Sequence, residues 1–182
     1  MSSPEDTPTL TPPVTARDHA EGNADAPITL VEYGDYECPH CGRAYPIVKA
    51  VQRRLGDELR FVFRNFPLRN IHPHAERAAE AAEAAAAQGH FWEMHDTIFE
   101  HQTELADHDL TRYAEGIRLD RSRFEEDLKS GAYKPRVQED FMSGIRSGVN
   151  GTPTFFIDGR RYEGSWDEKS LTQALQAARR GG

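Results

Sequence analysis

Two short apolar runs separated by a helical pattern stand near the beginning of the chain. Residues 28–33 are mostly apolar and predict a buried strand. Apolar residues then recur every three to four positions from Cys41 to Leu55, and Gly56 follows, which predicts a helix that ends there. Residues 59–64 alternate between apolar and polar and predict a second strand. A right-handed crossover through the helix would make the two strands parallel.

Helical patterns dominate the middle of the chain. Nine alanines occur in residues 75–87, and residues 91–99 carry aromatic and aliphatic side chains that we expect to form the core of this helical segment itself. Shorter helices are expected to begin near Asp109 and Asp120, because a carboxylate can cap the first turn of a helix. A last helix of this segment is expected over residues 135–148.

Strand signals return near the end of the chain. Residues 154–157 and 160–163 flank an Asp-Gly turn, which predicts a β-hairpin. Residues 165–168 form a capping box for a final helix that extends through residue 178. The order of strand, helix, strand, helical segment, hairpin and helix predicts an α/β fold.

These patterns divide the chain into four parts. We expect a disordered tail over residues 1–26, a first α/β part over 27–66, a helical insertion over 67–148 and a second α/β part over 149–182. The tail is predicted to be disordered because it has four prolines, no aromatic residue, and five acidic residues against one arginine.

Composition excludes several classes of partner. The chain has 182 residues, 37% of them hydrophobic, and a net charge of -8 at pH 7. An acidic chain without a cluster of Lys and Arg is a poor binder of nucleic acid or of anionic membranes. No apolar run reaches transmembrane length, so we expect no membrane insertion. The first residues lack a signal-peptide pattern, which indicates a cytoplasmic protein, or an extracytoplasmic one if a leader has been removed.

The two cysteines of the chain form one motif, Cys38-Pro39-His40-Cys41, at the junction of the first strand and the helix. Backbone N–H groups and the helix dipole favour a thiolate at this position, and Pro39 fits the first turn. One helical turn separates the two cysteines, which places their Cα atoms about 5 Å apart, within the span of a disulfide. We expect Cys38 to be the exposed attacking thiol and Cys41 to resolve the mixed disulfide.

Charged neighbours tune such a thiol. The imidazole of His40 can donate to a Cys38 thiolate or place positive charge near it. Each unit of pKa depression is worth about 1.4 kcal/mol and moves a two-electron potential by about 30 mV toward oxidising values. Asp35 and Glu37 precede the motif and oppose this effect. These opposing charges leave the net shift of the thiol pKa open, and the hypothesis drawn from the motif and His40 is net oxidation of client thiols.

The placement of this motif, together with Thr152-Pro153 just before the hairpin, resembles the DsbA-like family of thiol:disulfide oxidoreductases. The resemblance implies a thioredoxin-like fold with an inserted all-helical subdomain. It also implies a redox-active disulfide without a cofactor, protein or peptide thiols as substrates, and a redox partner that recycles the pair. In this family Thr152-Pro153 would be a cis peptide beside the cysteines, with the backbone of Thr152 free to pair with substrate. Glu32 would be a buried acid that takes or gives the Cys41 proton.

Other interpretations remain open from the sequence. Cys38, Cys41, His72 and His74 could form a tetrahedral zinc set, although the expected proline beside the thiols would block it. A reductase or isomerase has the same motif, because direction depends on potential. Isomerases of this superfamily are generally dimers, and without a dimerisation segment a monomer is expected.

Two further expectations concern the helical segment. A binding module or holdase would use this segment and the groove beside the cysteines, without redox chemistry. His90, His95 and His101 are expected to lie on helix surfaces or to cap hydrogen bonds rather than to bind a ligand.

Overall fold

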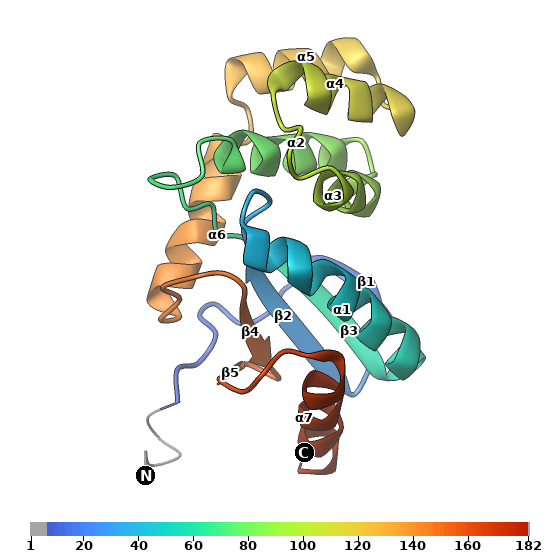
Figure 1. Cartoon of the computed structure of the whole chain (residues 1–182), viewed down its shortest axis with the longest axis vertical. Coiled ribbons are helices and arrows are strands. Elements are labelled where there is room, and N and C mark those ends of the chain that lie inside the picture. Colours follow the sequence, from blue (N-terminus) through green and yellow to red (C-terminus); the bar gives the residue numbers. More distant parts are fainter. Residues whose placement is uncertain (1–6, 182) are drawn as a thin grey trace.

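A mixed β-sheet lies at the centre of the protein in the computed structural model, which describes residues 7–181 (Figure 1). Five strands of the described residues are arranged in the order β1-β3-β2-β4-β5. Their bounds are β1 His19–Gly22, β2 Ile28–Gly34, β3 Leu59–Asn65, β4 Thr154–Ile157 and β5 Arg160–Tyr162.

The middle strand β2 is buried almost completely. It pairs in parallel with β3, from Ile28 opposite Leu59 to Gly34 opposite Asn65, as the crossover predicts. On its other side it pairs antiparallel with β4, and β4 forms the predicted hairpin with β5. Because both faces of β2 are covered, its sequence is a nearly continuous apolar run rather than an alternating one.

Helices cover the sheet and extend beyond one end of it (Figure 1). Helices α1 and α7 lie on the same side of the sheet, α2 to α5 stack beyond its end, and α6 leads from them back to the sheet. The bounds are α1 Pro39–Leu55, the short 3-10 helix η2 Gly56–Glu58, α2 Ala75–Ala87, α3 Phe91–Glu100, α4 Asp107–Gly116, α5 Arg121–Ser130, α6 Lys134–Arg146 and α7 Glu168–Arg180. None of the helices in residues 7–181 combines the length and the apolar character needed to cross a bilayer.

The predicted fold class is confirmed: this is an α/β thioredoxin-like fold with a helical insertion. One predicted helix start is also correct, since the Asp120 carboxylate caps α5 by accepting from the N–H of Arg123 at 3.1 Å. The predicted cap at Asp109 is wrong. Helix α4 begins two residues earlier, and Asp109 instead accepts from the N–H of Ala106 at 3.1 Å, closing the first turn from inside.

The helical insertion shares its core with the sheet. Phe91, Met94 and Ile98 are buried as expected, but they belong to the same hydrophobic cluster as Cys41 and Phe63. The small alanines of α2 let these helices pack closely. The insertion is therefore built into the core that surrounds the cysteines, rather than having a separate core of its own.

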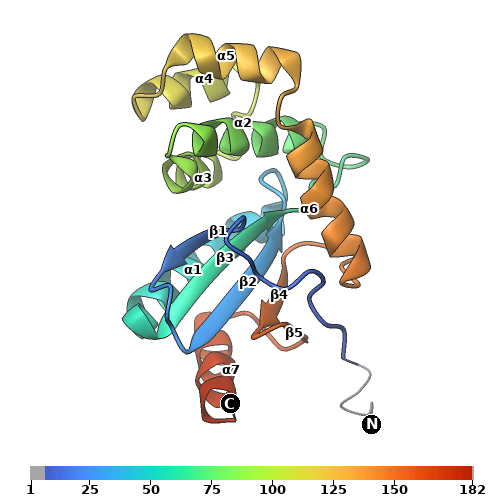
Figure 2. The ribbon, with the colours of Figure 1, turned by 180° about the vertical axis from the view of Figure 1, so that it is seen from behind.

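The prediction of a disordered tail over residues 1–26 is wrong for residues 7–26, and residues 1–6 lie outside the described residues. Strand β1 pairs antiparallel with β3 at the edge of the sheet, and Leu10 is buried against the sheet. Figure 2 shows this N-terminal segment crossing the face of the sheet opposite to α1. Low apolar content did not prevent ordering, because the segment is held largely by polar contacts.

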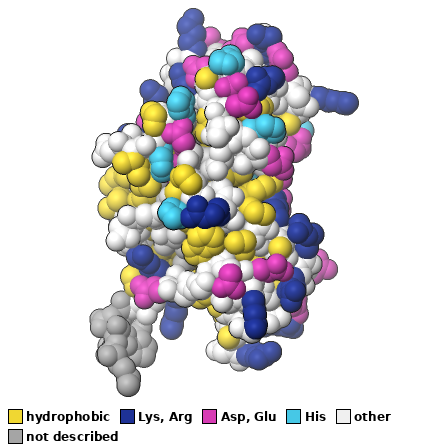
Figure 3. Space-filling model, viewed as in Figure 1, with side chains coloured by type: hydrophobic (Ala, Val, Ile, Leu, Met, Phe, Trp, Pro, Cys, Tyr) yellow, Lys and Arg dark blue, Asp and Glu magenta, His cyan; other side chains and the backbone are white. Residues whose placement is uncertain are grey.

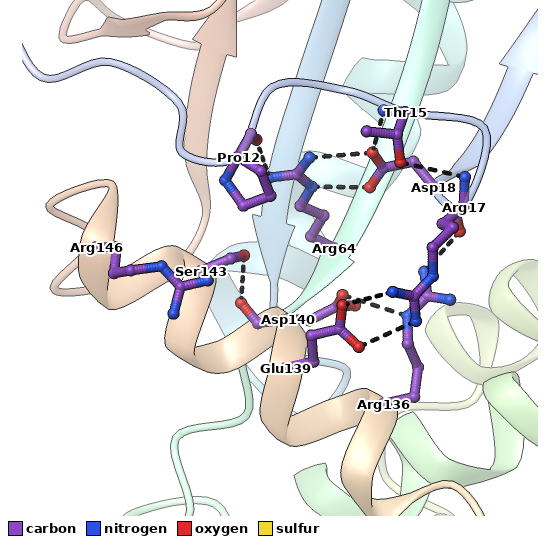
Figure 4. Close-up of a pocket in the computed structure, with 10 residues that line it drawn as sticks. All are labelled: Pro12, Thr15, Arg17, Asp18, Arg64, Arg136, Glu139, Asp140, Ser143 and Arg146. Atoms are coloured by element: carbon purple, nitrogen blue, oxygen red, sulfur yellow. Dashed lines mark hydrogen bonds and ion pairs between the residues drawn. The ribbon is translucent and has the colours of Figure 1, made fainter.

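Those polar contacts surround a hollow of about 180 Å³ between the N-terminal segment, β3 and α6 (Figure 4). The buried guanidinium of Arg64 donates to both carboxylate oxygens of Asp18, at 2.8 and 3.0 Å, and to the hydroxyl of Tyr33 at 2.9 Å. Nearer the surface, Arg17 pairs with Glu139 at 3.0 Å. The carboxylates and guanidinium groups of the hollow thus mostly pair with one another, which fastens the segment to the sheet and to α6.

Candidate active site

The two cysteines lie where β2 gives way to α1, as predicted. Cys38 is the N-cap of α1, with φ -67° and ψ 123°, and Pro39 occupies the first helical turn. The carbonyl oxygen of Cys38 accepts the helical hydrogen bond from Gly42 N–H at 3.0 Å. Cys38 therefore stands at the end of the helix where N–H groups have no helical partner.

Both thiols are free, and they differ in accessibility less than the sequence suggests. Cys38 is 3% exposed and Cys41 is fully buried. The expectation of an exposed attacking thiol is thus wrong as stated, because the loop after α6 packs over the helix start: the Cys38 thiol donates to the carbonyl oxygen of Thr152 at 3.6 Å. Cys38 nevertheless remains the more accessible of the two.

The surroundings of the two thiols shift their pKa values in opposite directions. A hydrogen bond from the Cys41 thiol lowers the pKa of Cys38 to about 5; burial opposes this shift, and hydrogen bonds from Thr152 and from the backbone of Cys41 and His40 support it. Burial raises the pKa of Cys41 well above its usual value, and the hydrogen bond with Cys38 adds to that increase. At neutral pH the pair is therefore a Cys38 thiolate beside a Cys41 thiol.

His40 acts on the thiol through its backbone. Its exposed side chain turns away and contacts the guanidinium of Arg43, whereas its N–H group is among the hydrogen bonds that lower the pKa of Cys38. The prediction that the imidazole lies at the thiolate is therefore wrong. The reason is local, because a side chain in the first turn of a helix points outward while the N–H groups point toward the N-cap.

Asp35 has a role that no pattern in the sequence indicated. Its buried carboxylate accepts from the N–H groups of Glu37 at 2.8 Å, Cys38 at 3.1 Å and Leu68 at 2.8 Å, and from Nδ1 of His72 at 2.8 Å. This carboxylate is surrounded by hydrogen-bond donors. It joins the loop before α1 to the segment before α2.

The histidines of the hypothetical zinc set are held by carboxylates. His72 bonds to Asp35, and Nδ1 of His74 bonds to Glu37 at 2.8 Å. Within residues 7–181 no group of three or more His, Cys, Asp or Glu side chains is arranged to hold a metal ion.

His95 differs from the expectation of a surface position. It is buried among aromatic rings of the shared core, and its Nδ1 bonds to the hydroxyl of Tyr36 at 3.0 Å. Burial holds the pKa of His95 well below its usual value, so this imidazole is neutral. His90 and His101 are hydrogen-bonded at the two ends of α3, in line with the expectation.

Glu32 is buried in β2, 3% exposed, and one of its carboxylate oxygens has no hydrogen-bond partner. Burial, with a smaller contribution from the charge of Cys38, raises the pKa of Glu32 to about 8. A carboxyl group with this pKa changes its protonation state close to neutral pH, which is the property needed for proton transfer at a nearby thiol.

The loop before β4 completes the site. The peptide bond between Thr152 and Pro153 is cis, as the resemblance implied. Its carbonyl oxygen accepts from the Cys38 thiol at 3.6 Å, and the buried hydroxyl of Thr152 has no hydrogen-bond partner. This hydroxyl is free to donate once a thiolate forms.

Comparisons with known proteins agree with this architecture. The family model described as Thioredoxin matches residues 15–177, so the chain belongs to the thioredoxin family. Its fold is similar to that of solved DsbA-type proteins such as alpha-DsbA1 of Wolbachia pipientis, which superposes with a TM-score of 0.78 at 19% identity, covering 92% of this chain and 94% of that one. BdbD of Bacillus subtilis (oxidised) superposes with a TM-score of 0.82 at 22% identity, covering 96% of this chain and 97% of that one. A thioredoxin-like oxidoreductase from Silicibacter pomeroyi DSS-3 superposes with a TM-score of 0.81 at 25% identity, covering 92% and 95%.

Curated relatives carry a different name. Na(+)/H(+) antiporter NhaA 1 of Mycobacterium sp. (strain KMS) is 48% identical over 174 residues, which is 94% of this chain and 28% of that protein. NhaA 3 of Salinispora tropica is 49% identical over 164 residues, or 89% of this chain and 25% of that protein. The chain thus spans about a quarter of the length of these relatives, and the antiporter name describes the whole of those proteins.

Proposed function

We propose that this protein is a thiol:disulfide oxidoreductase that exchanges a Cys38–Cys41 disulfide with protein thiols and works mainly as a dithiol oxidase. The observation that carries the proposal is the asymmetry of the pair: Cys38 lies at a helix N-terminus beside Thr152, and Cys41 is sealed in the core. A thiolate stabilised on one side makes the reduced pair the favoured form, so the disulfide is readily reduced by a client.

The proposed exchange has two steps. A client thiolate attacks Sγ of Cys38, the Cys38–Cys41 bond breaks, and Cys41 leaves with the electron pair and takes a proton, which Glu32 can supply. A second client thiolate then attacks the client sulfur of the mixed disulfide and releases Cys38 as a thiolate. The client loses two electrons and two protons, the pair gains the two electrons, and one proton goes to Cys41 while the other goes to solvent.

The surface near the site supports a protein client. Hydrophobic side chains gather on the face seen in Figure 3, on the side where α6 lies. The large hydrophobic side chains exposed among residues 7–181 are Ile71, Met142 and Ile145, which belong to the segment before α2 and to α6. Extended client segments would pair with the backbone of Thr152. The protein would carry out this oxidation as a monomer. It would work in an oxidising compartment, where a redox partner reoxidises the Cys38–Cys41 pair.

Equilibration with glutathione tests the direction of exchange. The fraction of reduced Cys38–Cys41 pair is measured by alkylation across a series of reduced-to-oxidised glutathione ratios, and oxidation of reduced, unfolded ribonuclease is followed in parallel. An oxidase stays reduced at ratios that oxidise ordinary protein dithiols and forms disulfides in the client. A pair that remains oxidised under strongly reducing buffer, together with rapid reduction of insulin, would instead establish a reductase.

A further inference from the structure

Gln102, in the loop between α3 and α4, reaches from the helical insertion to the redox motif. Its side-chain Nε2 donates to the carbonyl oxygen of Tyr36 and to that of Cys38, both at 2.9 Å. The carbonyl of Cys38 therefore accepts twice, from Gln102 and from the N–H of Gly42. Gln102 is separated from Cys38 by 64 positions in the chain, so sequence patterns gave no indication of this contact.

Gly42 provides the space that Gln102 fills. A Cβ atom added at Gly42 would lie 1.9 Å from Oε1 and 2.6 Å from Cδ of Gln102. Only a glycine at this position, one residue after Cys41, admits the amide in its present place. Gly42 and Gln102 are thus complementary parts of one contact between the insertion and the first turn of α1.

The bonded carbonyl controls the direction of the thiol. The peptide unit between Cys38 and Pro39 has no N–H group, because proline lacks one. Its carbonyl oxygen is therefore the hydrogen-bonding group through which this unit can be held in place. Holding this unit sets the ψ angle of Cys38, and with it the direction of the thiol relative to the N–H groups of His40 and Cys41.

We propose that Gln102 is a positioning residue that holds Cys38 in the N-cap geometry in which its thiolate is stabilised. The proposal rests on the function proposed above, and it assigns to the helical insertion a role in setting the reactivity of the cysteine pair. The Gln102 amide bonds to the backbone carbonyl oxygens of Tyr36 and Cys38, and Gln102 therefore acts through the backbone of Cys38.

The first experiment compares Gln102→Ala with Gln88→Ala. Gln88 is a matched control, because its amide also bonds to backbone at two points, donating to Asp120 O at 3.3 Å and accepting from Asp120 N at 2.8 Å, within the same insertion. The rate of Cys38 alkylation by iodoacetamide is measured against pH in each reduced protein, together with thermal unfolding. We expect Gln102→Ala to move the titration midpoint upward by about one pH unit, a tenfold lower thiolate fraction in the acidic range. Gln88→Ala should leave the midpoint unchanged even if it lowers the melting temperature equally.

Two further variants separate hydrogen bonding from packing. Gln102→Glu keeps the size of the side chain but removes the donating amide and adds a negative charge beside Cys38, and both changes should raise the midpoint, so that the rise is at least as large as in Gln102→Ala. Gly42→Ala should act in the same way by expelling the amide. The double variant of Gly42→Ala and Gln102→Ala should be no worse than either single variant, because both remove the same contact.

The outcomes are distinct. Equal midpoints in the wild-type protein and Gln102→Ala, a midpoint kept by Gln102→Glu, or additive effects of Gly42→Ala and Gln102→Ala would each overturn the positioning role. A wild-type midpoint near that of a free peptide thiol would overturn the proposed function itself, and the positioning role would fall with it. Loss of midpoint control in Gln102→Ala alone, with Gln88→Ala unchanged, supports the proposal.

Discussion

The Cys38 thiol lies 3.6 Å from the carbonyl oxygen of Thr152, although 114 positions separate the two residues in the chain. The fold brings together two short motifs, one at the start of α1 and one before β4. Strand β4 makes this possible because it pairs directly with β2, which carries the cysteine loop at its end. The redox site is therefore a product of the sheet order.

Replacing Thr152 with valine tests the contribution of its hydroxyl to the thiolate. Valine keeps the branched shape but removes the hydroxyl, which has no other hydrogen-bond partner. We expect the pKa of Cys38 to rise by about one unit, corresponding to the loss of a hydrogen bond to a charged group of about 1.5 kcal/mol. The pH profile of alkylation measures the change.

Thr172→Val is the matched control for this substitution. Thr172 is also buried with an unbonded hydroxyl, but it lies in α7, near Arg54 at the far end of α1. The Cys38 profile should not change in this variant. Equal shifts in the two variants would mean that the Thr152 hydroxyl has no special relation to the thiolate.

The two cysteines should differ sharply in reactivity. Because hydrogen bonding from Cys41 lowers the pKa of Cys38 to about 5, alkylation of the reduced protein should be half-maximal near pH 5 and level above pH 6. Cys41→Ser should trap a mixed disulfide with a client, whereas Cys38→Ser should form none. Each variant is incubated with a peptide that contains a disulfide, and mass spectrometry shows which variant has formed the mixed disulfide. Faster labelling of Cys41 than of Cys38 would reverse the assigned roles.

Local patterns in the sequence predicted the elements that carry the site. The apolar run of β2, the helical spacing after Cys41 and the Asp-Gly turn each depend on neighbours within a few residues, and all three were correct. What could not be predicted depends on partners far along the chain. Gln102 is an ordinary polar residue in a loop, and nothing near it in the sequence shows that it reaches Cys38.

The order of the N-terminal segment also depends on partners far along the chain. Its composition is that of a disordered chain, and composition measures how much apolar surface a segment can bury. Asp18 is ordered because it pairs with Arg64, and β1 is ordered because it pairs with the edge of β3. Both partners are formed by the folded sheet, so they are not visible in the composition of the segment.

Glu32→Gln should change how resolution depends on pH. Burial raises the pKa of Glu32 to about 8, so the wild-type carboxylate becomes available as a base as the pH rises through 8. Without this carboxylate, attack by Cys41 on a mixed disulfide should be slower by about tenfold or more. General bases typically contribute at least about 100-fold to a rate, so a loss of this size is expected. Stopped-flow measurement of resolution between pH 6 and 9 checks this, and unchanged rates throughout would remove Glu32 from the mechanism.

The same substitution should alter stability with a predictable sign. A carboxyl group whose pKa is raised by folding stabilises the folded state only while it is protonated, so the wild-type protein should lose stability as the pH rises from about 4.5 to 8. Glu32→Gln should lack this loss. Glu80→Gln is the control for the resolution rate. Glu80 is also buried, with an oxygen that has no hydrogen-bond partner and a raised pKa, but it lies in α2 beside Arg77. This variant should leave the resolution rate unchanged.

Asp18→Asn should show how strongly the buried Asp18–Arg64 ion pair fastens the N-terminal segment. The asparagine keeps the shape of the side chain but leaves the buried Arg64 charge without a counter-charge, a loss that typically costs about 3–5 kcal/mol. Glu139→Gln removes the charge that pairs with Arg17. The side chain of Glu139 is 52% exposed and that of Arg17 is 70% exposed, so this loss should cost less than about 1 kcal/mol. Urea unfolding gives both free energies.

The stabilisation from the Asp18–Arg64 pair should also depend on pH. Burial alone would raise the pKa of Asp18, but the hydrogen bonds from Arg64 lower it below its usual value. The stabilisation is therefore present above the usual pKa of an aspartate and is lost as the pH falls below that value. Equal and small losses in both variants would show that the strand pairing of β1, rather than the buried charge, holds the segment in place.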